Sequence, residues 1–350
     1  MTSSLITGGC GFLGRHLTKL LLDAGSAVTL LDPAPCAEHF APDVRHLRAS
    51  VTDTAALEEA MEGAGRVFHM AGTPHLWAPR RSGAYALHLE GTRAVVDAAV
   101  RRGGVRVIHT STEAILRDFT GSGGGGGLAP ESHPDSEPWL PRARTLPPGY
   151  CRAKLASERL VLDAAREGHD VVIVSPASLL GPGDTSLTPP TRMLLGFLRG
   201  RFPAFLEGWL RIADVRDVAS AHLEAAVRGV PGQRYVVGGP DQRMSAFLRD
   251  LEEVSGRPMP KVRVPSLLAL ATAHAAEFLA NTITRRAPNA TVAGVRLALA
   301  PAVPDLDAPP ESSGMGRRPG FAPRALRMTL RDTVAWLENT GLIESPARRA

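Results

Sequence analysis

The segment from Leu5 to Gly14, which reads LITGGCGFLG, constrains the fold of this chain more than any other. An apolar pair precedes its first glycine, and a helical pattern begins directly after its last. Gly8 allows a tight turn, Gly11 lets the backbone approach a pyrophosphate, and Gly14 lets a helix lie close to the preceding strand. A helix N-terminus offers free N–H groups and a positive dipole end to phosphates. The segment predicts a strand, a phosphate-binding turn and a helix; the alternative is an ordinary turn in a chain with 35 glycines.

An acidic residue follows the next expected strand, which covers residues 27–31. Asp32 stands 18 residues after Gly14, and the first arginine beyond it is Arg45. In a dinucleotide-binding fold, a carboxylate at this place accepts hydrogen bonds from the adenosine ribose and repels a 2′-phosphate. The pattern therefore favours NAD over NADP; the alternative is a solvated acid at a strand end.

Strands and helices alternate along more than half of the chain, which predicts an α/β fold: a Rossmann-type doubly wound parallel sheet with a smaller, mainly helical C-terminal lobe. Residues 1–178, completed by about 211–240, form the NAD-binding domain, and residues 179–210 and 241–345 form the substrate-binding lobe. The expected strands are 27–31, 44–49, 66–72, 105–109, 171–174, 210–213 and 234–237, and the expected helices are 55–61, 85–100, 150–166, 191–199, 217–227, 245–255, 265–281 and 330–339.

Two of these strands carry further information. Val171–Val174 consists of valine and isoleucine alone, which is typical of a strand buried on both faces. Arg234–Val237 is expected to return to the edge of the sheet. Residues 118–149, with five glycines at 123–127, and residues 299–324, which are rich in proline, carry no regular pattern.

The composition is that of a globular protein, with 44% hydrophobic and 21% charged residues. The net charge of +5 comes from scattered arginines with no basic run among aromatic residues, which argues against a nucleic-acid partner. Three cysteines without a CxxC motif indicate a reducing compartment, and we expect a cytoplasmic protein. The first strand begins close to Met1, so we expect no signal peptide.

The most apolar long run is Leu267–Ala280, which His274 and Glu277 interrupt. It is too short for a transmembrane segment. We expect a buried helix here rather than one that lies on a membrane surface.

Tyr150 and Lys154 form the second strong feature of the sequence, since the chain contains only three tyrosines and three lysines. Four residues apart on a helix, their side chains share one face. A tyrosine normally loses its proton near pH 10, and a nearby ammonium lowers that pKa. We therefore expect Lys154 to lower the pKa of Tyr150, so that the phenol can exchange a proton with a substrate hydroxyl. The alternative is a pair on the helix surface.

Hydroxyl side chains end the strand at 105–109, at the edge where open α/β sheets bind ligands. Thr112 is preferred over Ser111 as the group that orients the substrate oxygen, because alternation lets only one face the cleft. The alternative is that both merely cap the strand. His69 and His109 lie within apolar strands and are expected to be packed core residues, and the histidine spacing indicates no metal site.

The chain resembles the extended short-chain dehydrogenases/reductases of the NAD-dependent epimerase/dehydratase superfamily. Within it, the dihydroflavonol-reductase-like branch is most similar, especially the hopanoid-associated sugar epimerase proteins. The segments that carry the resemblance are TGGCGFLG (7–14), VFHMAG (67–72), LEGTRAVVDAA (89–99), VIHTST (107–112), YCRAK (150–154), VVIVSPASLLGPGD (171–184), IADVRDVASAH (212–222) and YVVGG (235–239).

The resemblance implies a catalytic Thr112, Tyr150 and Lys154, with Tyr150 and Lys154 also beside the nicotinamide and its ribose. It further implies cofactor contacts at Phe12 and Leu13 (pyrophosphate), Val51 (adenine), Ala71 and Gly72 (along the cofactor), and Pro176 to Ser178 (carboxamide). A homodimer built on helices 85–100 and 150–166 is also implied. Four residues depart from the family pattern, namely Ser50, His88, Ala153 and Ser175.

These observations predict an NAD-dependent oxidoreductase that interconverts a secondary alcohol and a ketone or aldehyde. One alternative is a nucleotide-sugar epimerase or dehydratase with tightly bound NAD, for which Arg192, Arg199, Arg201 and Arg211 could bind the diphosphate. Another is a non-catalytic protein that senses NAD, because fold does not determine function. The apolar C-terminal lobe suggests a hydrophobic small-molecule substrate.

Overall fold

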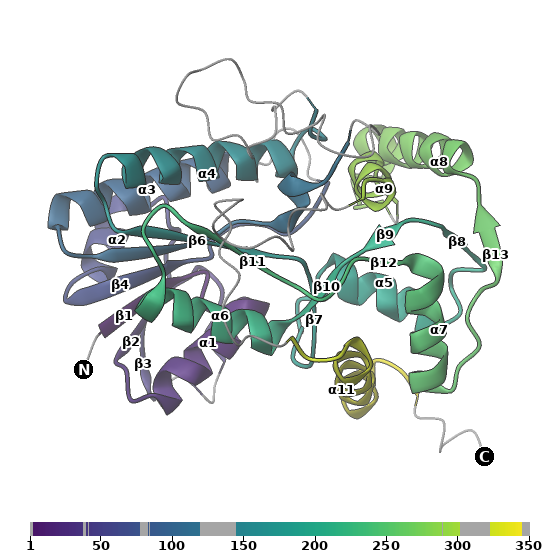
Figure 1. Cartoon of the computed structure of the whole chain (residues 1–350), viewed down its shortest axis with the longest axis horizontal. Coiled ribbons are helices and arrows are strands. Elements are labelled where there is room, and N and C mark those ends of the chain that lie inside the picture. The colour runs from purple at the N-terminus through teal and green to yellow at the C-terminus, as the bar shows by residue number, and fades with distance from the viewer. Residues whose placement is uncertain are drawn as a thin grey trace.

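A seven-stranded parallel sheet forms the centre of the larger half of the protein (Figure 1). The computed structural model describes residues 3–37, 40, 42–77, 83, 85–119, 145–288, 290–301 and 323–344. The strand order is β11-β6-β5-β4-β1-β2-β3. The strands are β1 (Ser3–Thr7), β2 (Val28–Leu31), β3 (Val44–Leu47), β4 (Ala64–His69), β5 (Arg106–Thr110), β6 (Val171–Pro176) and β11 (Arg234–Val237).

Helices cover both faces of this sheet. On one face lie α2 (Thr54–Ala60), α3 (Ala86–Arg102) and α4 (Tyr150–Arg166), and on the other lie α1 (Phe12–Asp23) and α6 (Val215–Arg228) (Figure 1). Each face buries its own apolar core against these helices. The doubly wound fold expected from the sequence is therefore confirmed.

Local sequence explains the main elements. All six residues of β6 are buried, as its valine and isoleucine content predicts, and β11 pairs with it at the sheet edge. Asp53 caps α2, because its carboxylate accepts a hydrogen bond from the Ala56 amide at 3.1 Å. Helix α1 begins at Phe12, directly after the glycine turn, rather than at Arg15.

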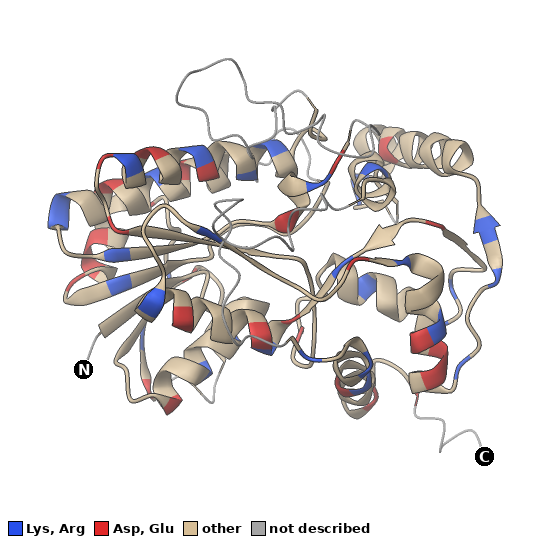
Figure 2. Ribbon diagram, viewed as in Figure 1, with Lys and Arg blue, Asp and Glu red and all other residues tan. Residues whose placement is uncertain are grey.

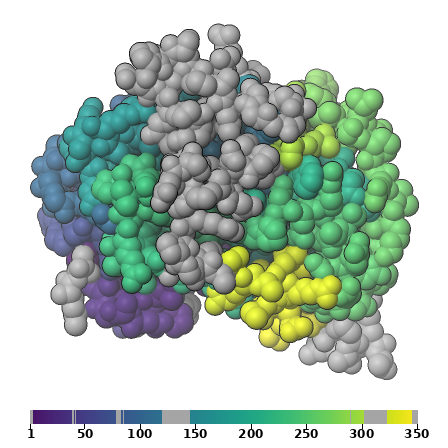
Figure 3. Space-filling view, viewed as in Figure 1, coloured from purple at the N-terminus to yellow at the C-terminus, as the bar shows by residue number. Residues whose placement is uncertain are grey.

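The C-terminal lobe packs beside the sheet domain (Figure 3). A parallel pair, β7 (Ser178–Leu180) and β10 (Ile212–Asp214), leads into it. Its core joins α5 (Pro189–Leu198), α7 (Met244–Ser255) and α11 (Leu326–Asn339). The other elements of the lobe are β8 (Ala204–Leu206), β9 (Trp209–Leu210), β12 (Gln242–Arg243), β13 (Val262–Val264), α8 (Ser266–Leu279), a π-helical turn (Ala280–Thr284) and α9 (Val292–Leu299).

Two details of this lobe differ from the expectation. The single strand expected at 210–213 is divided at Arg211, since Leu210 pairs with β12 whereas Ile212 pairs with β7. Helix α9 was not expected from the sequence. It ends at Leu299, where the segment without a regular pattern begins. The glycine run 123–127 and most of the segment 299–324 lie outside the described residues.

The expectation that residues 267–280 form a buried helix is wrong. Helix α8 buries only Ala269 and Ala273 against α9, with Leu270 partly buried beside them, and its other large apolar side chains are exposed. Its ribbon is almost entirely free of charged residues (Figure 2). Among the described helices, none has both the length and the apolar character that crossing a bilayer requires.

Candidate active site

The glycine turn between β1 and α1 is as tight as its spacing predicts. Gly8 has a φ of 76°, and a Cβ there would lie 2.9 Å from the Ala71 backbone, so the turn touches the end of β4. A Cβ on Gly14 would lie 2.5 Å from the Gly8 oxygen, which fixes α1 close to the turn. By contrast, a Cβ on Gly11 would meet only that same oxygen, at 3.2 Å. The turn therefore leaves open space at Gly11 for a ligand.

The N-terminus of α1 is suited to bind an anion. Its N-cap is Gly11, and within the described residues no side chain caps it and no acidic residue lies in its first turn. The amides of Phe12 and Leu13 therefore point into the space above the turn together with the positive end of the helix dipole. Strands β1 and β4 are neighbours at the point where the strand order reverses, which is where such sheets bind ligands.

Asp32 lies directly after β2, at the rim of the same turn. Its carboxylate accepts hydrogen bonds from the Cys10 amide at 3.0 Å and from the Ala34 amide at 2.9 Å. These bonds fix both oxygens while leaving each with further lone pairs. The carboxylate is therefore held in place, so that hydroxyl groups of a ligand above the turn can donate to it.

The remaining residues expected at the cofactor follow the carboxyl ends of neighbouring strands. Val51 is 3% exposed and packs so closely on α3 that a Cβ on Gly91 would lie 2.6 Å from it. Ala71 and Gly72 follow β4, Pro176 ends β6, and Ser178 begins β7. All of these positions lie along the edge of the sheet that carries the glycine turn.

Three expected catalytic residues meet at the end of β5. Tyr150 begins α4, and its phenol is hydrogen-bonded to the Thr112 hydroxyl. The Thr112 oxygen also accepts from the Ala114 amide at 3.2 Å, which leaves its hydroxyl proton to be donated. Lys154, one helical turn after Tyr150, is buried, and its Nζ donates to the Thr110 carbonyl at 2.9 Å.

Burial dominates the protonation of this group. It raises the pKa of Tyr150 to about 12, although the hydrogen bond from Thr112 partly opposes the shift. Burial also lowers the pKa of Lys154 to about 8. The expectation that Lys154 lowers the pKa of Tyr150 is therefore wrong for these residues by themselves, since the ammonium is turned to the Thr110 carbonyl. At neutral pH the phenol keeps its proton.

Ser111 belongs to a different contact, which was not expected from the sequence. Its hydroxyl donates to Glu158, and Glu158 forms an ion pair with Arg234 of β11. Both partners of this ion pair are fully buried. Ser111 therefore faces α4 rather than the substrate side. Through Glu158, the residue after β5 and the edge strand β11 are both joined to α4. The spacing of Tyr150, Lys154 and Glu158 at intervals of four was the available signal, because it places all three on one helix face.

Histidines surround the site as neutral, packed groups. Burial lowers the pKa of His69 to about 3, and its ring nitrogens bond the hydroxyls of Thr7 at 2.8 Å and Thr92 at 3.0 Å. His69 and His109 are both buried with ring centroids 5.5 Å apart, so the expectation that they are core residues is confirmed. Neither ring carries a positive charge at neutral pH, because burial lowers the pKa of His109 as well.

His88 is a contact of Tyr150 that was not assigned from the sequence. Its ring lies edge-on to the Tyr150 ring at 5.6 Å, and its Nε2 lies 3.1 Å from the Thr73 carbonyl. Burial lowers the pKa of His88 to about 3, so the ring is neutral. A histidine where the family commonly has asparagine was the signal in the sequence.

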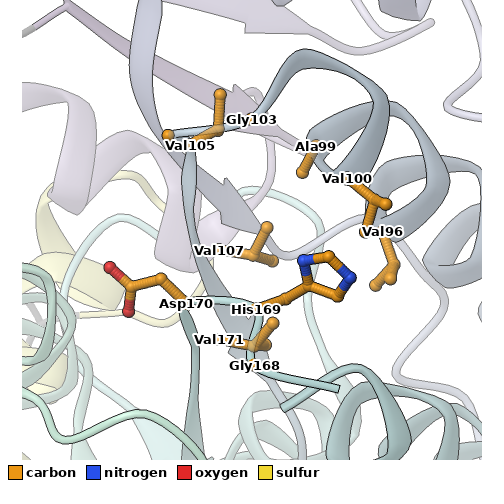
Figure 4. Close-up of a pocket in the computed structure, with 11 residues that line it drawn as sticks. Val96, Ala99, Val100, Gly103, Val105, Val107, Gly168, His169, Asp170 and Val171 are labelled. Carbon is orange, nitrogen blue, oxygen red and sulfur yellow. The ribbon is translucent and has the colours of Figure 1, made fainter.

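A cavity of about 220 Å³ lies at the opposite edge of the sheet, between the beginnings of β5 and β6 (Figure 4). Its lining is mostly valine and glycine, and His169 and Asp170 are its only titratable residues. It contains none of the expected site residues. Within the described residues there is no group of three or more histidines, cysteines or acids that could hold a metal ion.

Comparison with known proteins shows the family of the chain. Residues 4–238 match the model of the NAD dependent epimerase/dehydratase family. A Synechocystis protein provisionally named dihydroflavonol 4-reductase is 30% identical over 346 residues, covering 97% of this chain and 96% of that protein. Sterol demethylase protein B of Methylococcus capsulatus is also 30% identical over 346 residues, covering 97% and 100%.

The fold has close counterparts among solved structures. The crystal structure of gox2253 superposes with a TM-score of 0.77 at 27% identity, covering 98% of this chain and 100% of that one. The glycine turn, the carboxylate after β2 and the Tyr150–Lys154 helix all lie within the segment that the family model matches. The chain belongs to the NAD dependent epimerase/dehydratase family of extended short-chain dehydrogenases/reductases.

Proposed function

We propose that this protein is an NAD-dependent oxidoreductase that interconverts a secondary alcohol and a ketone. The observation that carries the proposal is the hydrogen-bonded pair of Thr112 and Tyr150, which stands at the carboxyl end of β5. The open glycine turn lies two strands away along the same edge. A proton donor and a nucleotide cradle on one edge are the two components that such a reaction needs.

The residues present fit a nicotinamide dinucleotide. The amides of Phe12 and Leu13 would hold its pyrophosphate, the Asp32 carboxylate its adenosine ribose, and the Lys154 ammonium its other ribose. When bound, the nicotinamide supplies the hydride for reduction, or accepts it in oxidation.

The chain's own residues manage the proton. In reduction, the Tyr150 phenol gives its proton to the carbonyl oxygen of the substrate as the carbon receives hydride. The Thr112 hydroxyl donates a hydrogen bond to the same oxygen and so orients the carbonyl. Because burial raises the pKa of Tyr150 to about 12, the phenol is ready at neutral pH to act as an acid. Oxidation needs the opposite charge state, in which Tyr150 accepts the proton of the alcohol.

Asp32 tests the preference for NAD over NADP. We expect Asp32→Asn to weaken NAD binding about tenfold, since a hydrogen bond to a charged acceptor contributes roughly 1.5–3 kcal/mol. The amide oxygen can keep only one of the two bonds, that from the Cys10 amide or that from the Ala34 amide, so circular dichroism has to verify that the variant is folded. NADP affinity should rise, because the repulsion of its 2′-phosphate is gone. Calorimetric titration with both dinucleotides measures the two changes.

The matched control is Asp23→Asn, which removes an exposed carboxylate at the far end of α1. It should leave both affinities unchanged. Equal affinities for the two dinucleotides in the parent protein, with no change in Asp32→Asn, would contradict the role given to Asp32.

The substrate is proposed to be hydrophobic. Of the four arginines that the sequence offers to a sugar diphosphate, Arg199 donates to the Leu342 carbonyl at 2.6 Å and Arg211 is only 6% exposed, whereas Arg192 and Arg201 are exposed. The core of the C-terminal lobe is apolar. One relative, which is 30% identical to this chain over 97% of its length, is named for a sterol. These observations favour a sterol-like or other polycyclic alcohol over a nucleotide sugar.

The experiment that separates the candidate functions follows NADH and products together. Purified protein is incubated with NAD⁺ and hydroxysteroids, and in parallel with UDP-sugars. The proposal predicts NADH in step with ketone. An isomerised sugar without net NADH would instead establish the epimerase alternative, and NAD binding without any turnover would establish the sensing alternative.

A further inference from the structure

Helix α8 presents its large apolar side chains to the outside of the protein. Leu267 is 81% exposed, Phe278 is 66% exposed, and Ile283, in the π-helical turn that continues the helix, is 71% exposed. Leu268 and Leu279 are exposed beside them. Leu267 and Leu268 begin the helix, and the other three residues end it. Exposed Ala271, His274 and Ala275 lie between them at helical spacings of three and four. The large apolar side chains therefore form two clusters along one side of α8, joined by small residues and one histidine. We call these five residues the α8 stripe.

The inward side of α8 holds the small residues and the one acid. Ala269 and Ala273 are buried against α9, with Val295 as their partner. Glu277 is turned away from the stripe, because its Oε1 accepts from the Val292 amide at 2.8 Å. Leu270 is the one large apolar side chain of α8 that packs on this inner side, whereas the other four are exposed, and the α8 stripe contains no carboxylate.

Basic residues lie at both ends of the stripe. Arg285 and Arg286 follow the π-helical turn, are exposed, and within the described residues form no ion pair with a carboxylate. At the other end, Lys261 and Arg263 precede α8, but both are paired with carboxylates: Lys261 with Glu252 at 2.6 Å and Arg263 with Glu207 at 3.2 Å. The α8 stripe therefore has one pair of cations without a carboxylate partner among the described residues, Arg285 and Arg286, at its C-terminal end.

We infer that the α8 stripe docks on the surface of an anionic lipid bilayer. A contiguous exposed apolar patch on a soluble domain marks an interaction surface. Here the leucine, phenylalanine and isoleucine side chains enter the boundary between headgroups and acyl chains, while Arg285 and Arg286 meet lipid phosphates. A second copy of the chain is the alternative occupant, and the vesicle and oligomer measurements below separate the two.

The position of α9 connects this surface to the site. Helix α9 lies between α8 and the segment after Thr112: the Ala300 carbonyl accepts from Arg117 at 2.8 Å, and the Pro301 carbonyl accepts from the Asp118 amide at 3.0 Å. A bilayer held at α8 would therefore be close to the catalytic edge. This part of the inference rests on the proposed function, since a membrane-dissolved alcohol or ketone is the substrate class that such docking would serve.

The test is sedimentation with vesicles, and it contains neither cofactor nor substrate. Parent protein should bind phosphatidylcholine vesicles that contain about one quarter phosphatidylglycerol, and added salt should weaken this binding. Phe278→Glu should lower the partition coefficient at least about tenfold, since burying one phenylalanine is worth about 1.5–3 kcal/mol. The double variant Arg285→Glu/Arg286→Glu should lower it about thirtyfold or more on anionic vesicles only.

The control is Val227→Glu, which places the same charge on a side chain of α6 that is 65% exposed. It should bind vesicles as the parent does. All variants change exposed side chains, and unchanged circular dichroism and melting temperature verify their folding.

Failure of the parent to bind anionic vesicles, or equal binding by Phe278→Glu, would overturn the inference. So would a parent dimer that Phe278→Glu converts to monomer without any vesicle binding. Because the assay does not involve turnover, its failure is distinguishable from failure of the proposed function.

Discussion

Replacing Tyr150 by Phe is expected to lower kcat about a thousandfold while leaving NAD affinity nearly unchanged. The Tyr150 phenol is hydrogen-bonded to Thr112, and it is the group that the proposal assigns to exchange a proton with the substrate oxygen. The ring itself packs edge-on against His88, and phenylalanine keeps that contact. Steady-state kinetics and calorimetric titration of NAD separate the two effects.

A matched control is available in the same chain. The Tyr235 hydroxyl bonds the Val230 amide and the Gln233 side chain at 3.0 Å each, next to β11 and outside the site. Tyr235→Phe should therefore keep the parent kcat. Turnover by Tyr150→Phe at the parent rate would remove Tyr150 from the mechanism.

Replacing Lys154 by Met is expected to abolish most activity and to stabilise the fold at neutral pH. Burial lowers the pKa of Lys154 from its ordinary 10.5 to about 8, so the folded state binds this proton less tightly than the unfolded state does. Holding the charge inside therefore costs on the order of 3 kcal/mol below the folded pKa. Methionine fills similar space without that charge, although it also loses the bond to the Thr110 carbonyl.

The sign of this effect fixes its pH dependence. As pH rises from 8 to 10.5, the parent loses the buried charge and its stability rises, so the advantage of Lys154→Met should shrink. Urea unfolding at about pH 7 and about pH 10 measures both values. Lys19→Met, at an exposed position of α1, is the control and should change neither. A variant that is less stable than the parent at neutral pH would contradict the assigned burial cost.

Much of the architecture follows from short-range patterns in the sequence. The glycine spacing fixed the positions of β1 and α1, because positive φ and close backbone contact each require glycine at a defined place. The valine-rich composition of β6 predicted its burial on both faces. Asp53 predicted the start of α2, since its carboxylate could satisfy a free helical amide.

Other features depend on contacts between distant segments and could not be predicted in this way. The ion pair of Glu158 with Arg234 joins residues 76 positions apart, and no local pattern distinguishes a buried charge from a surface one. The outward direction of the α8 stripe depends on α9, which packs against Ala269 and Ala273 rather than the leucines of the stripe. The protonation of Tyr150 was expected from its distance along a helix to Lys154, whereas burial, a property of the whole fold, decides it.

The most direct test of the central claim is an ultraviolet titration of Tyr150 with and without NAD⁺. The chain contains only three tyrosines, so the absorbance of one tyrosinate can be resolved by comparison with Tyr150→Phe. In the protein alone, Tyr150 should ionise near pH 12, because burial raises its pKa to about 12. With saturating NAD⁺, the positive nicotinamide ring beside the phenol should lower that pKa by at least about two units, and the transition should be missing in Tyr150→Phe. A titration of Tyr150 that NAD⁺ leaves unchanged would show that the phenol does not face the cofactor.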